Sequence, residues 1–176
     1  MVFFTSRSIS RRGFLTLLAG TPLAAYLSAP QRYTFTLIAG SNGMVRHFDR
    51  GLALNNLGMV VFSATLQTGE AGVFTGNGGP LSQIASSRER FTSFGGPYGS
   101  YAPTLNDAGT IVVYGDLQTG GTALYLSRGG QLMPIADTTH TFAYLGQAFI
   151  NNRGTVVFSA RRGARAEGLT APELVD

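Results

Sequence analysis

Apolar or small residues occupy every second position from Val60 to Leu66, and the same alternation returns from Ile111 to Leu117. Successive side chains of a β-strand point to opposite faces, so this period of two predicts strands with one strongly buried face. Shorter apolar runs follow these strands, at 72–74, 81–85, 123–125 and 132–136. The pattern therefore predicts an all-β chain built from antiparallel β-meanders.

Turn tetrads rich in Asn and Gly precede the alternating segments. Asn and Asp side chains accept hydrogen bonds from the backbone of their own turn, and Gly tolerates a positive φ. The three tetrads are Asn55-Asn56-Leu57-Gly58, Asn106-Asp107-Ala108-Gly109 and Asn151-Asn152-Arg153-Gly154. Repeated turns of this kind can also collect oxygen ligands for Ca²⁺, but each tetrad offers at most one carboxylate, which is too little charge for tight binding. We therefore expect hairpin turns here rather than metal sites.

Two long segments of the chain are copies of one another. Residues 54–85 and 105–136 share thirteen identities in thirty-two aligned positions, without a gap. A third copy opens at 150–160, where eight of eleven residues equal those of 54–64. Internal repeats of this length indicate an array of equivalent structural units. The predicted organisation is a signal segment at 1–29, a partial first repeat at 30–53, repeats at 54–104 and 105–149, and a truncated, degenerate repeat at 150–176.

Each complete unit contains three predicted strands, and a shorter fourth strand is expected at 91–95 and 142–146. Such units have the size of a β-propeller blade, in which neighbouring sheets bury each other's faces. About two and a half units are present, whereas closed propellers have at least four blades. Arg162 also stands where the earlier units have Leu66 and Leu117. The expected fold is an incomplete array, either a truncated copy of a longer repeat or one that self-associates through open sheet edges.

The N-terminal segment carries an export motif made of Ser10, Arg11, Arg12, Phe14 and Leu15. This motif, followed by a moderately apolar stretch, resembles the twin-arginine signal, which a receptor reads as an address. The resemblance implies a signal helix, passage through the twin-arginine export machinery, and a periplasmic or extracellular location. The apolar stretch 14–29 has only sixteen residues, against about twenty in a membrane span. Membrane contact is therefore expected only during export, unless an uncleaved signal tethers the protein.

Charge and composition exclude several functional classes. The formal net charge is +4, but Arg7, Arg11 and Arg12 lie in the signal segment, and the other ten arginines nearly balance the nine acidic residues. Those arginines form no basic stripe, so nucleic-acid binding is not expected. The chain has no Cys, which excludes disulfides, cysteine-ligated zinc and thiol nucleophiles.

No catalytic, cofactor-binding or metal-binding residue is predicted from the remaining polar residues. The only two histidines, His47 and His140, lack the spacing of metal ligands, although each has an acidic neighbour, Asp49 or Asp137. The serines form no nucleophile motif. A pair of carboxylates for glycosidase-type hydrolysis could only be assembled by the fold, from Glu70, Glu89, Asp107, Asp116 and Asp137.

Aromatic residues gather around an inserted loop near residue 98. Phe91 and Phe94 are expected to pack between units, whereas Tyr98 and Tyr101 are candidate contacts for a ligand or partner. The insertion adds about six residues to the first complete unit, and insertions of this kind mark exposed loops. These two tyrosines are the only ligand contacts that the sequence suggests.

The units resemble those of a family of exported bacterial repeat proteins, frequent in cyanobacteria, that read approximately INNxGTVVFxAxL, GxGIFxGxGGPL and IAxTxxxFxxFG. The resemblance covers about residues 34–160, and it rests on the stretches 72–81, 84–85 and 151–160. It implies a propeller-like fold and supplies no catalytic residues. The sequence therefore favours a non-enzymatic binding or structural module of the cell envelope. The alternative is a hydrolase-type enzyme whose carboxylate site exists only in the folded chain.

Overall fold

The computed structural model describes residues 2–8, 33–41, 43–96 and 100–163, and this part of the chain contains β-strands and no helix. The strands are β1 (Val2–Ser8), β2 (Tyr33–Gly40), β3 (Val45–Leu54), β4 (Val60–Leu66), β5 (Ala71–Gly76), β6 (Ser82–Ser86), β7 (Phe91–Phe94), β8 (Thr104–Leu105), β9 (Ile111–Leu117), β10 (Thr122–Arg128), β11 (Gln131–Asp137), β12 (Phe142–Ile150) and β13 (Val156–Arg162). All strand pairings are antiparallel, which confirms the predicted all-β class.

The predicted signal helix and its export motif lie outside the described residues. Within the predicted signal segment, residues 2–8 form β1, which pairs with β2. The sequence did not indicate a strand there. In the described part of the chain, no helix has the length and hydropathy needed to cross a membrane.

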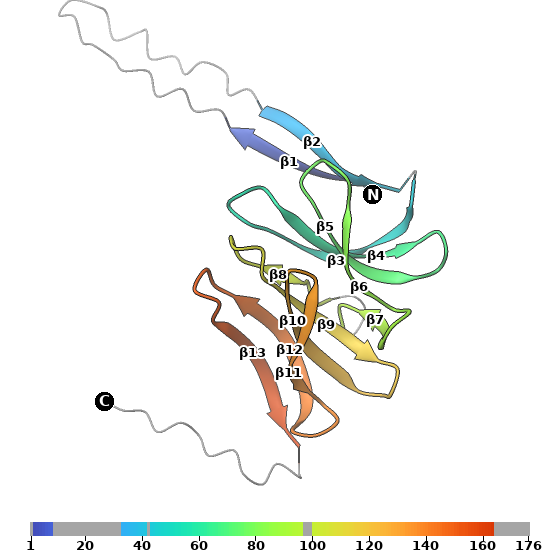
Figure 1. Cartoon of the computed structure of the whole chain (residues 1–176), viewed down its shortest axis with the longest axis vertical. Coiled ribbons are helices and arrows are strands. Elements are labelled where there is room, and N and C mark those ends of the chain that lie inside the picture. The colour runs from blue at the N-terminus through green and yellow to red at the C-terminus, as the bar shows by residue number, and fades with distance from the viewer. Residues whose placement is uncertain (1, 9–32, 42, 97–99, 164–176) are drawn as a thin grey trace, which may run out of the picture.

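The strands form four sheets that follow one another along the long axis of the molecule (Figure 1). An N-terminal pair, β1–β2, comes first. The first sheet has the order β3-β4-β5-β6, and the second sheet has the order β7-β9-β10-β11 with β8 also paired to β9. The C-terminal hairpin, β12–β13, comes last. A four-stranded sheet and a five-stranded sheet thus lie between two pairs of strands.

The strand predicted to end each unit instead begins the next sheet. β7 pairs with β9, with Phe91 opposite Leu117, and β8 continues along the same strand. Together β7 and β8 lie beside β9 as β3 lies beside β4, with the inserted loop separating them. Each sheet therefore takes its first strand from the sequence that precedes its turn tetrad.

Both faces of β4 are buried, so the expectation of a single buried face is wrong. Phe62 is 0% exposed and packs with Ile38 and Ala39 of β2 on one side. Val61 is also 0% exposed and packs on the other side with Ile111 of the second sheet. The reason is the stacking of sheets, because a sheet that lies between two neighbours loses both of its solvent faces.

The junction between the second sheet and the C-terminal hairpin repeats this arrangement. Val112, Tyr114 and Leu124 pack against Leu145 and Ala148 of β12. By contrast, the outer face of the hairpin faces solvent. There Val157, which repeats Val61 and Val112, is 64% exposed. Each unit thus presents one face to the unit before it and one to the unit after it.

Candidate functional site

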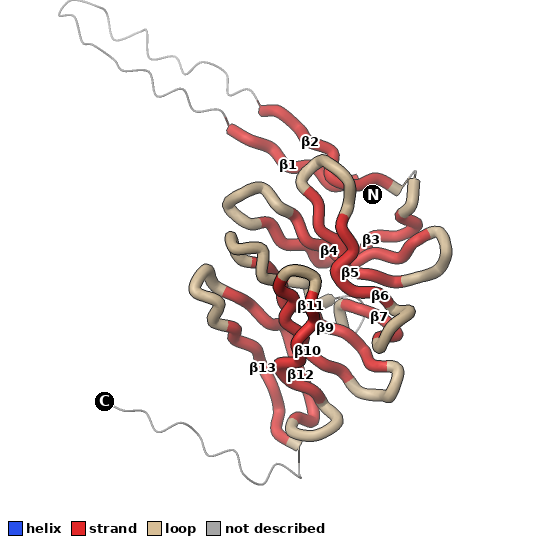
Figure 2. Tube along the Cα trace, in the orientation of Figure 1, coloured by secondary structure: helices blue, strands red, loops and turns tan. Residues whose placement is uncertain are grey.

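The three turn tetrads lie one above another on the same side of the molecule (Figure 2). The Nδ2 of Asn55 donates to the carbonyl oxygen of Asn106 at 3.1 Å, and the Nδ2 of Asn106 donates to the carbonyl oxygen of Asn151 at 3.1 Å. The Oδ1 of each Asn also accepts backbone N–H groups of its own turn, as that of Asn106 does from Thr110 at 2.9 Å. We call this row of three asparagines the Asn ladder. It ties consecutive units together through side chains at one repeat position.

A second row of polar residues runs beside the Asn ladder. Asp107 accepts from the backbone N–H and the Nδ2 of Asn56, and its Oδ2 also accepts from the Nδ2 of Asn152 at 2.7 Å. The Asn56 side-chain hydrogen bond is the largest of the effects that lower the pKa of Asp107. This carboxylate therefore joins three turns. Both of its oxygens accept hydrogen bonds from the neighbouring turns.

The other candidate carboxylates mostly hold neighbouring strands in place. Glu70 accepts from Ser86 Oγ at 2.5 Å and Gln83 Nε2 at 2.8 Å, and it forms an ion pair with Arg88 at 2.8 Å. The hydrogen bond from Ser86 contributes most to lowering the pKa of Glu70. Asp116 accepts from the hydroxyl of Ser93, which joins β9 to β7.

Glu70 and Glu89 line the same open surface cleft, of about 360 Å³. The fold thus brings these two of the five candidate carboxylates to a shared cleft. Glycosidases need one carboxylic acid with a raised pKa to protonate the leaving group. The pKa of Glu70 is lowered instead, because its oxygens accept hydrogen bonds and face Arg88.

The two histidines lie in different parts of the molecule, His47 on β3 and His140 on the turn after β11. His140 contacts Asp137 at 3.0 Å on an exposed turn, and the hydrogen bond from Thr139 is the main cause of the lowered pKa of Asp137. His47 lies on β3, where burial raises the pKa of its neighbour Asp49 and the charge of His47 opposes that rise. Within the described ranges, no three His, Asp or Glu side chains come close enough to hold a metal ion together.

Of the two tyrosines predicted as ligand contacts, Tyr98 lies outside the described residues. Tyr101 packs edge-on against Tyr114, with ring centroids 5.0 Å apart, and its hydroxyl shares a hydrogen bond with that of Tyr144. This hydrogen bond is the largest of the effects that raise the pKa of Tyr101 to about 12. Tyr101 is therefore an uncharged part of the junction between the second sheet and the C-terminal hairpin, with its hydroxyl edge turned outward.

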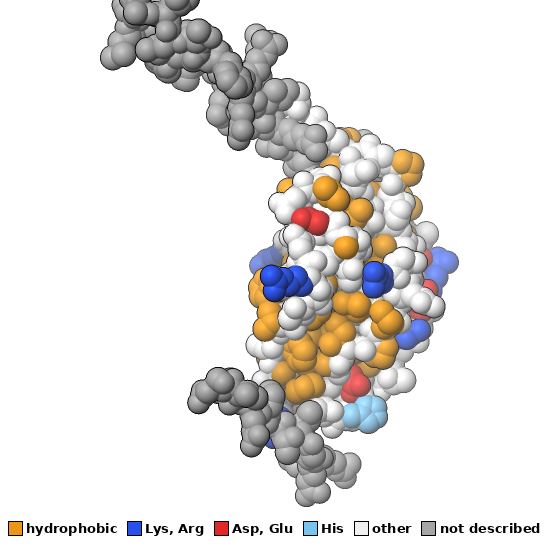
Figure 3. Space-filling model, turned by 60° about the vertical axis from the view of Figure 1, so that its left-hand side comes forward, with side chains coloured by type: hydrophobic (Ala, Val, Ile, Leu, Met, Phe, Trp, Pro, Cys, Tyr) orange, Lys and Arg blue, Asp and Glu red, His pale blue; other side chains and the backbone are white. Residues whose placement is uncertain are grey.

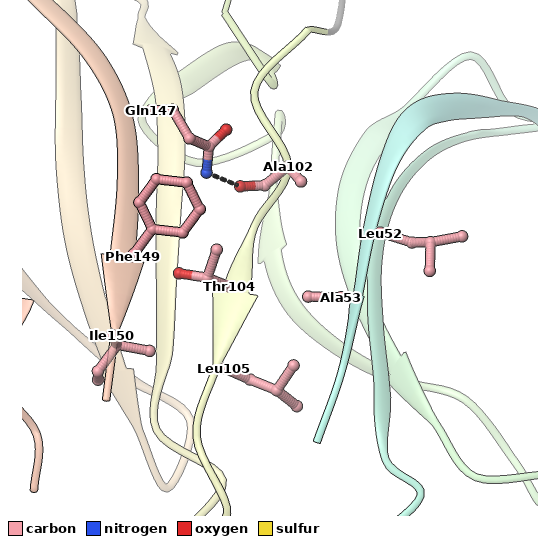
Figure 4. Close-up of a pocket in the computed structure, with 8 residues that line it drawn as sticks. All are labelled: Leu52, Ala53, Ala102, Thr104, Leu105, Gln147, Phe149 and Ile150. Carbon is pink, nitrogen blue, oxygen red and sulfur yellow. Dashed lines mark hydrogen bonds between the residues drawn. The ribbon is translucent and has the colours of Figure 1, made fainter. Parts of the chain in front are cut away.

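A groove of about 420 Å³ opens beside the first strands of the successive units, β3, β8 and β12 (Figure 4). Its lining is mostly apolar: Leu52, Ala53, Ala102, Thr104, Leu105, Gln147, Phe149 and Ile150. The side chain of Gln147 crosses toward β8, where its Nε2 donates to the carbonyl oxygen of Ala102 at 2.9 Å. The same Nε2 also donates to the carbonyl oxygen of Ala148 at 2.8 Å.

Exposed apolar side chains gather on one face of the molecule (Figure 3). Phe149, in the groove lining, is 58% exposed, and it lies directly opposite Val157 across the C-terminal hairpin. Sequence reasoning missed these groove residues, because they come from different units and look like ordinary strand residues. Contiguous exposed apolar surface commonly marks a binding site.

Comparisons with known proteins give a family but no activity. A search of curated proteins found no match, and a search of solved structures found none either. A family model described as a family of unknown function, DUF7453, matches residues 34–171. The match covers every strand from β3 to β13, including the Asn ladder and the groove. The chain therefore belongs to the family of unknown function DUF7453.

Proposed function

We propose that this protein is an exported, non-enzymatic module of the cell envelope that binds a ligand or partner through the groove between β3, β8 and β12. The observation that carries the proposal is the mostly apolar lining of the groove, in which Thr104 and Gln147 are the only polar side chains among the residues described there. Ligand sites are typically concave and apolar with a few polar groups that fix orientation, and a volume of a few hundred Å³ is typical of them. The arrangement favours an apolar ligand or segment with few polar groups.

The engagement of the carboxylates supports a non-enzymatic role. Glu70, Asp107 and Asp116 each accept hydrogen bonds that hold strands or turns together. The hydrolase alternative rests on the cleft that contains Glu70 and Glu89. It would require glycoside hydrolysis that disappears in both Glu70→Gln and Glu89→Gln, whereas we expect no hydrolysis by the unmodified protein.

Filling the groove should weaken binding of an apolar probe. Thr104 lines the groove on β8, so Thr104→Arg places a long charged side chain within it. We expect the dissociation constant of the uncharged fluorescent probe Nile red to rise by about tenfold or more, as judged by fluorescence titration, because a charged group displaces the apolar contacts. Ser82→Arg, on the exposed part of β6, is the matched control and should leave the affinity unchanged. Equal affinity in the two variants would place the probe elsewhere and contradict the proposal.

Export should depend on the paired arginines. Replacing Arg11 and Arg12 with Lys keeps the positive charge but removes the residue type that the twin-arginine receptor reads. We expect the double variant to stay in the cytoplasm of the producing cell, as measured by cell fractionation and immunoblotting. A variant with Lys at Arg7 alone is the control and should be exported normally. Normal export of the double variant would refute the twin-arginine assignment.

A further inference from the structure

The two junctions between consecutive units are built from the same repeat positions. At the first junction, Val61 and Leu105 lie in one apolar cluster, and the Nδ2 of Asn55 donates to the next turn. At the second junction, Val112 packs with Ile150, and the Nδ2 of Asn106 donates in the same way. Each unit thus offers a valine and an amide donor to the unit that follows it.

The C-terminal hairpin carries the same valine and amide, but both are exposed. Val157 is 64% exposed, although its equivalents Val61 and Val112 are buried. The Nδ2 of Asn151 has no acceptor among the described residues, while its Oδ1 accepts from Arg153 and Thr155 like the other ladder residues. This end of the array therefore presents an apolar residue and a hydrogen-bond donor in the geometry of a unit junction.

The first sheet carries the complementary half of a junction, also exposed. Leu54 is 55% exposed, whereas its equivalent Leu105 is 8% exposed, and Leu52 beside it points away from β8 (Figure 4). Among the described residues, the carbonyl oxygen of Asn55 accepts only from Gly58, while that of Asn106 accepts from both Gly109 and Asn55. The first sheet therefore lacks the valine and the amide donor that the hairpin presents.

We propose that two copies of this chain associate head to tail, with the C-terminal hairpin of one copy packed against β3 of the other. Val157 would contact Leu54 of the second copy, and the Nδ2 of Asn151 would donate to the carbonyl oxygen of its Asn55. The partner is a second copy because the two ends of the chain are complementary. The hairpin presents a valine and an amide donor, and the first sheet presents the leucine and the carbonyl oxygen that such groups contact at the junctions within the chain. The interface continues the junction that the fold already uses twice.

The N-terminal strand leaves room for this contact. Ile38 and Thr36 of β2 approach Gly76 and Gly78, so β2 covers the first sheet near the end of β5. Leu54 lies on β3, at the opposite edge of that sheet. β2 also packs against Val60 and Phe62 of β4, but Leu52 and Leu54 at the end of β3 are 43% and 55% exposed. The docked hairpin would contact this exposed end of β3, beside the N-terminal pair. Together, β1–β2 of one copy and the docked β12–β13 of the other would occupy the position of one four-stranded unit.

Head-to-tail contacts close into a ring or extend into a filament. Each copy contributes its two complete sheets. At each junction between copies, the N-terminal pair of one copy and the C-terminal hairpin of the other make the equivalent of one more unit. Two copies then give about six units, which lies within the four to eight blades of propellers, whereas one copy gives about three and three copies about nine. We therefore expect closure at the dimer.

The test is size-exclusion chromatography with multi-angle light scattering on the purified full chain over a range of concentrations. We expect a dimer that Val157→Arg and Leu54→Arg each weaken by about 100-fold or more, because each buries an unpaired charge in the interface. Asn151→Asp, which keeps the acceptor of its own turn but loses the donor, should weaken it less. The control is Met133→Arg on β11, which is exposed but lies at neither end and should remain dimeric.

Mixing the two arginine variants distinguishes head-to-tail from symmetric contact. A mixed pair of Val157→Arg and Leu54→Arg keeps one unmodified junction, so part of the dimer should return when the variants are combined. Unchanged circular dichroism melting at low concentration shows that each variant still folds. A monomer at all concentrations would overturn the proposal, and so would a dimer that Val157→Arg disrupts and Leu54→Arg does not.

Discussion

Phe62→Ala is expected to lower the free energy of unfolding by about 3 to 5 kcal/mol, as measured by urea titration. The side chain of Phe62 is 0% exposed, and its ring lies 5.5 Å from that of Phe48 and 6.0 Å from that of Phe74, measured between centroids. Truncation removes buried apolar area and leaves a cavity between the first sheet and β2 that neighbouring strands fill only in part.

The matched control for this prediction is Phe149→Ala, the same substitution on an exposed strand position. At concentrations where the protein is monomeric, we expect the control to cost less than about 0.5 kcal/mol, since little area is buried there. Equal losses in the two variants would mean that the stacking of the N-terminal pair on the first sheet is wrong. A small loss in both would mean that β4 is not a core strand.

Asn106→Asp should lower the free energy of unfolding at pH 7 by about 3 kcal/mol. The substitution keeps the shape of the side chain and the acceptor for Thr110, but it replaces the Nδ2 donor with a second oxygen. Asn106 is 4% exposed, so the carboxylate would face the carbonyl oxygen of Asn151 without water between them. The cost combines a lost hydrogen bond with an uncompensated buried charge.

Protonation should reverse part of this loss. Burial raises the pKa of the introduced carboxyl, and once protonated its hydroxyl can donate to the carbonyl oxygen of Asn151. The difference from the unmodified protein should therefore shrink as the pH falls from 7 toward 4. Asn151→Asp is the control, because its Nδ2 has no acceptor among the described residues of its own chain, and it should cost the monomer about 1 kcal/mol or less. Equal costs for both variants would show that the Asn ladder adds no stability between units.

Much of the strand order follows from the sequence, because the repeat fixes where turns and apolar runs recur. The strands after the first two tetrads form where the alternation predicted them, as β4 and β9, and β13 forms in the third copy of the repeat. The turns also take the expected backbone, with Gly58, Gly109 and Gly154 all at positive φ. Local signals were sufficient for these elements, since turn geometry and strand periodicity depend on neighbours in the sequence.

The burial of both faces could not be read from the alternation. Phe62 lies on the face of β4 that the alternation marks as apolar, and Val61 and Ser63 lie on the other face. In the structure Ser63 is only 2% exposed, because the second sheet covers that face. The alternation shows that the two faces of the strand differ in polarity. It does not show whether a neighbouring sheet covers the more polar face, so the burial of that face could not be predicted from it.

The sequence contains a pattern that indicates the Asn ladder and that turn formation alone does not explain. A turn of this type needs only a side-chain acceptor at its first position, which Asp would also supply. The first position is Asn in all three tetrads, at 55, 106 and 151, while the second position varies between Asn and Asp. A requirement for the amide indicates that the donor is used as well. The groove left no comparable signal, since its lining comes from three strands that meet only in the fold.

β13 pairs with β12 along one edge, and its other edge has no partner strand among the described residues. Exposed strand edges are templates for aggregation, and charged side chains on them oppose it. β13 ends in Arg161 and Arg162, both exposed, where the equivalent residues of β4 are Thr65 and Leu66. The departure from the repeat at this edge therefore has a use in solubility: two positive charges repel the edges of other copies and hinder indiscriminate sheet growth.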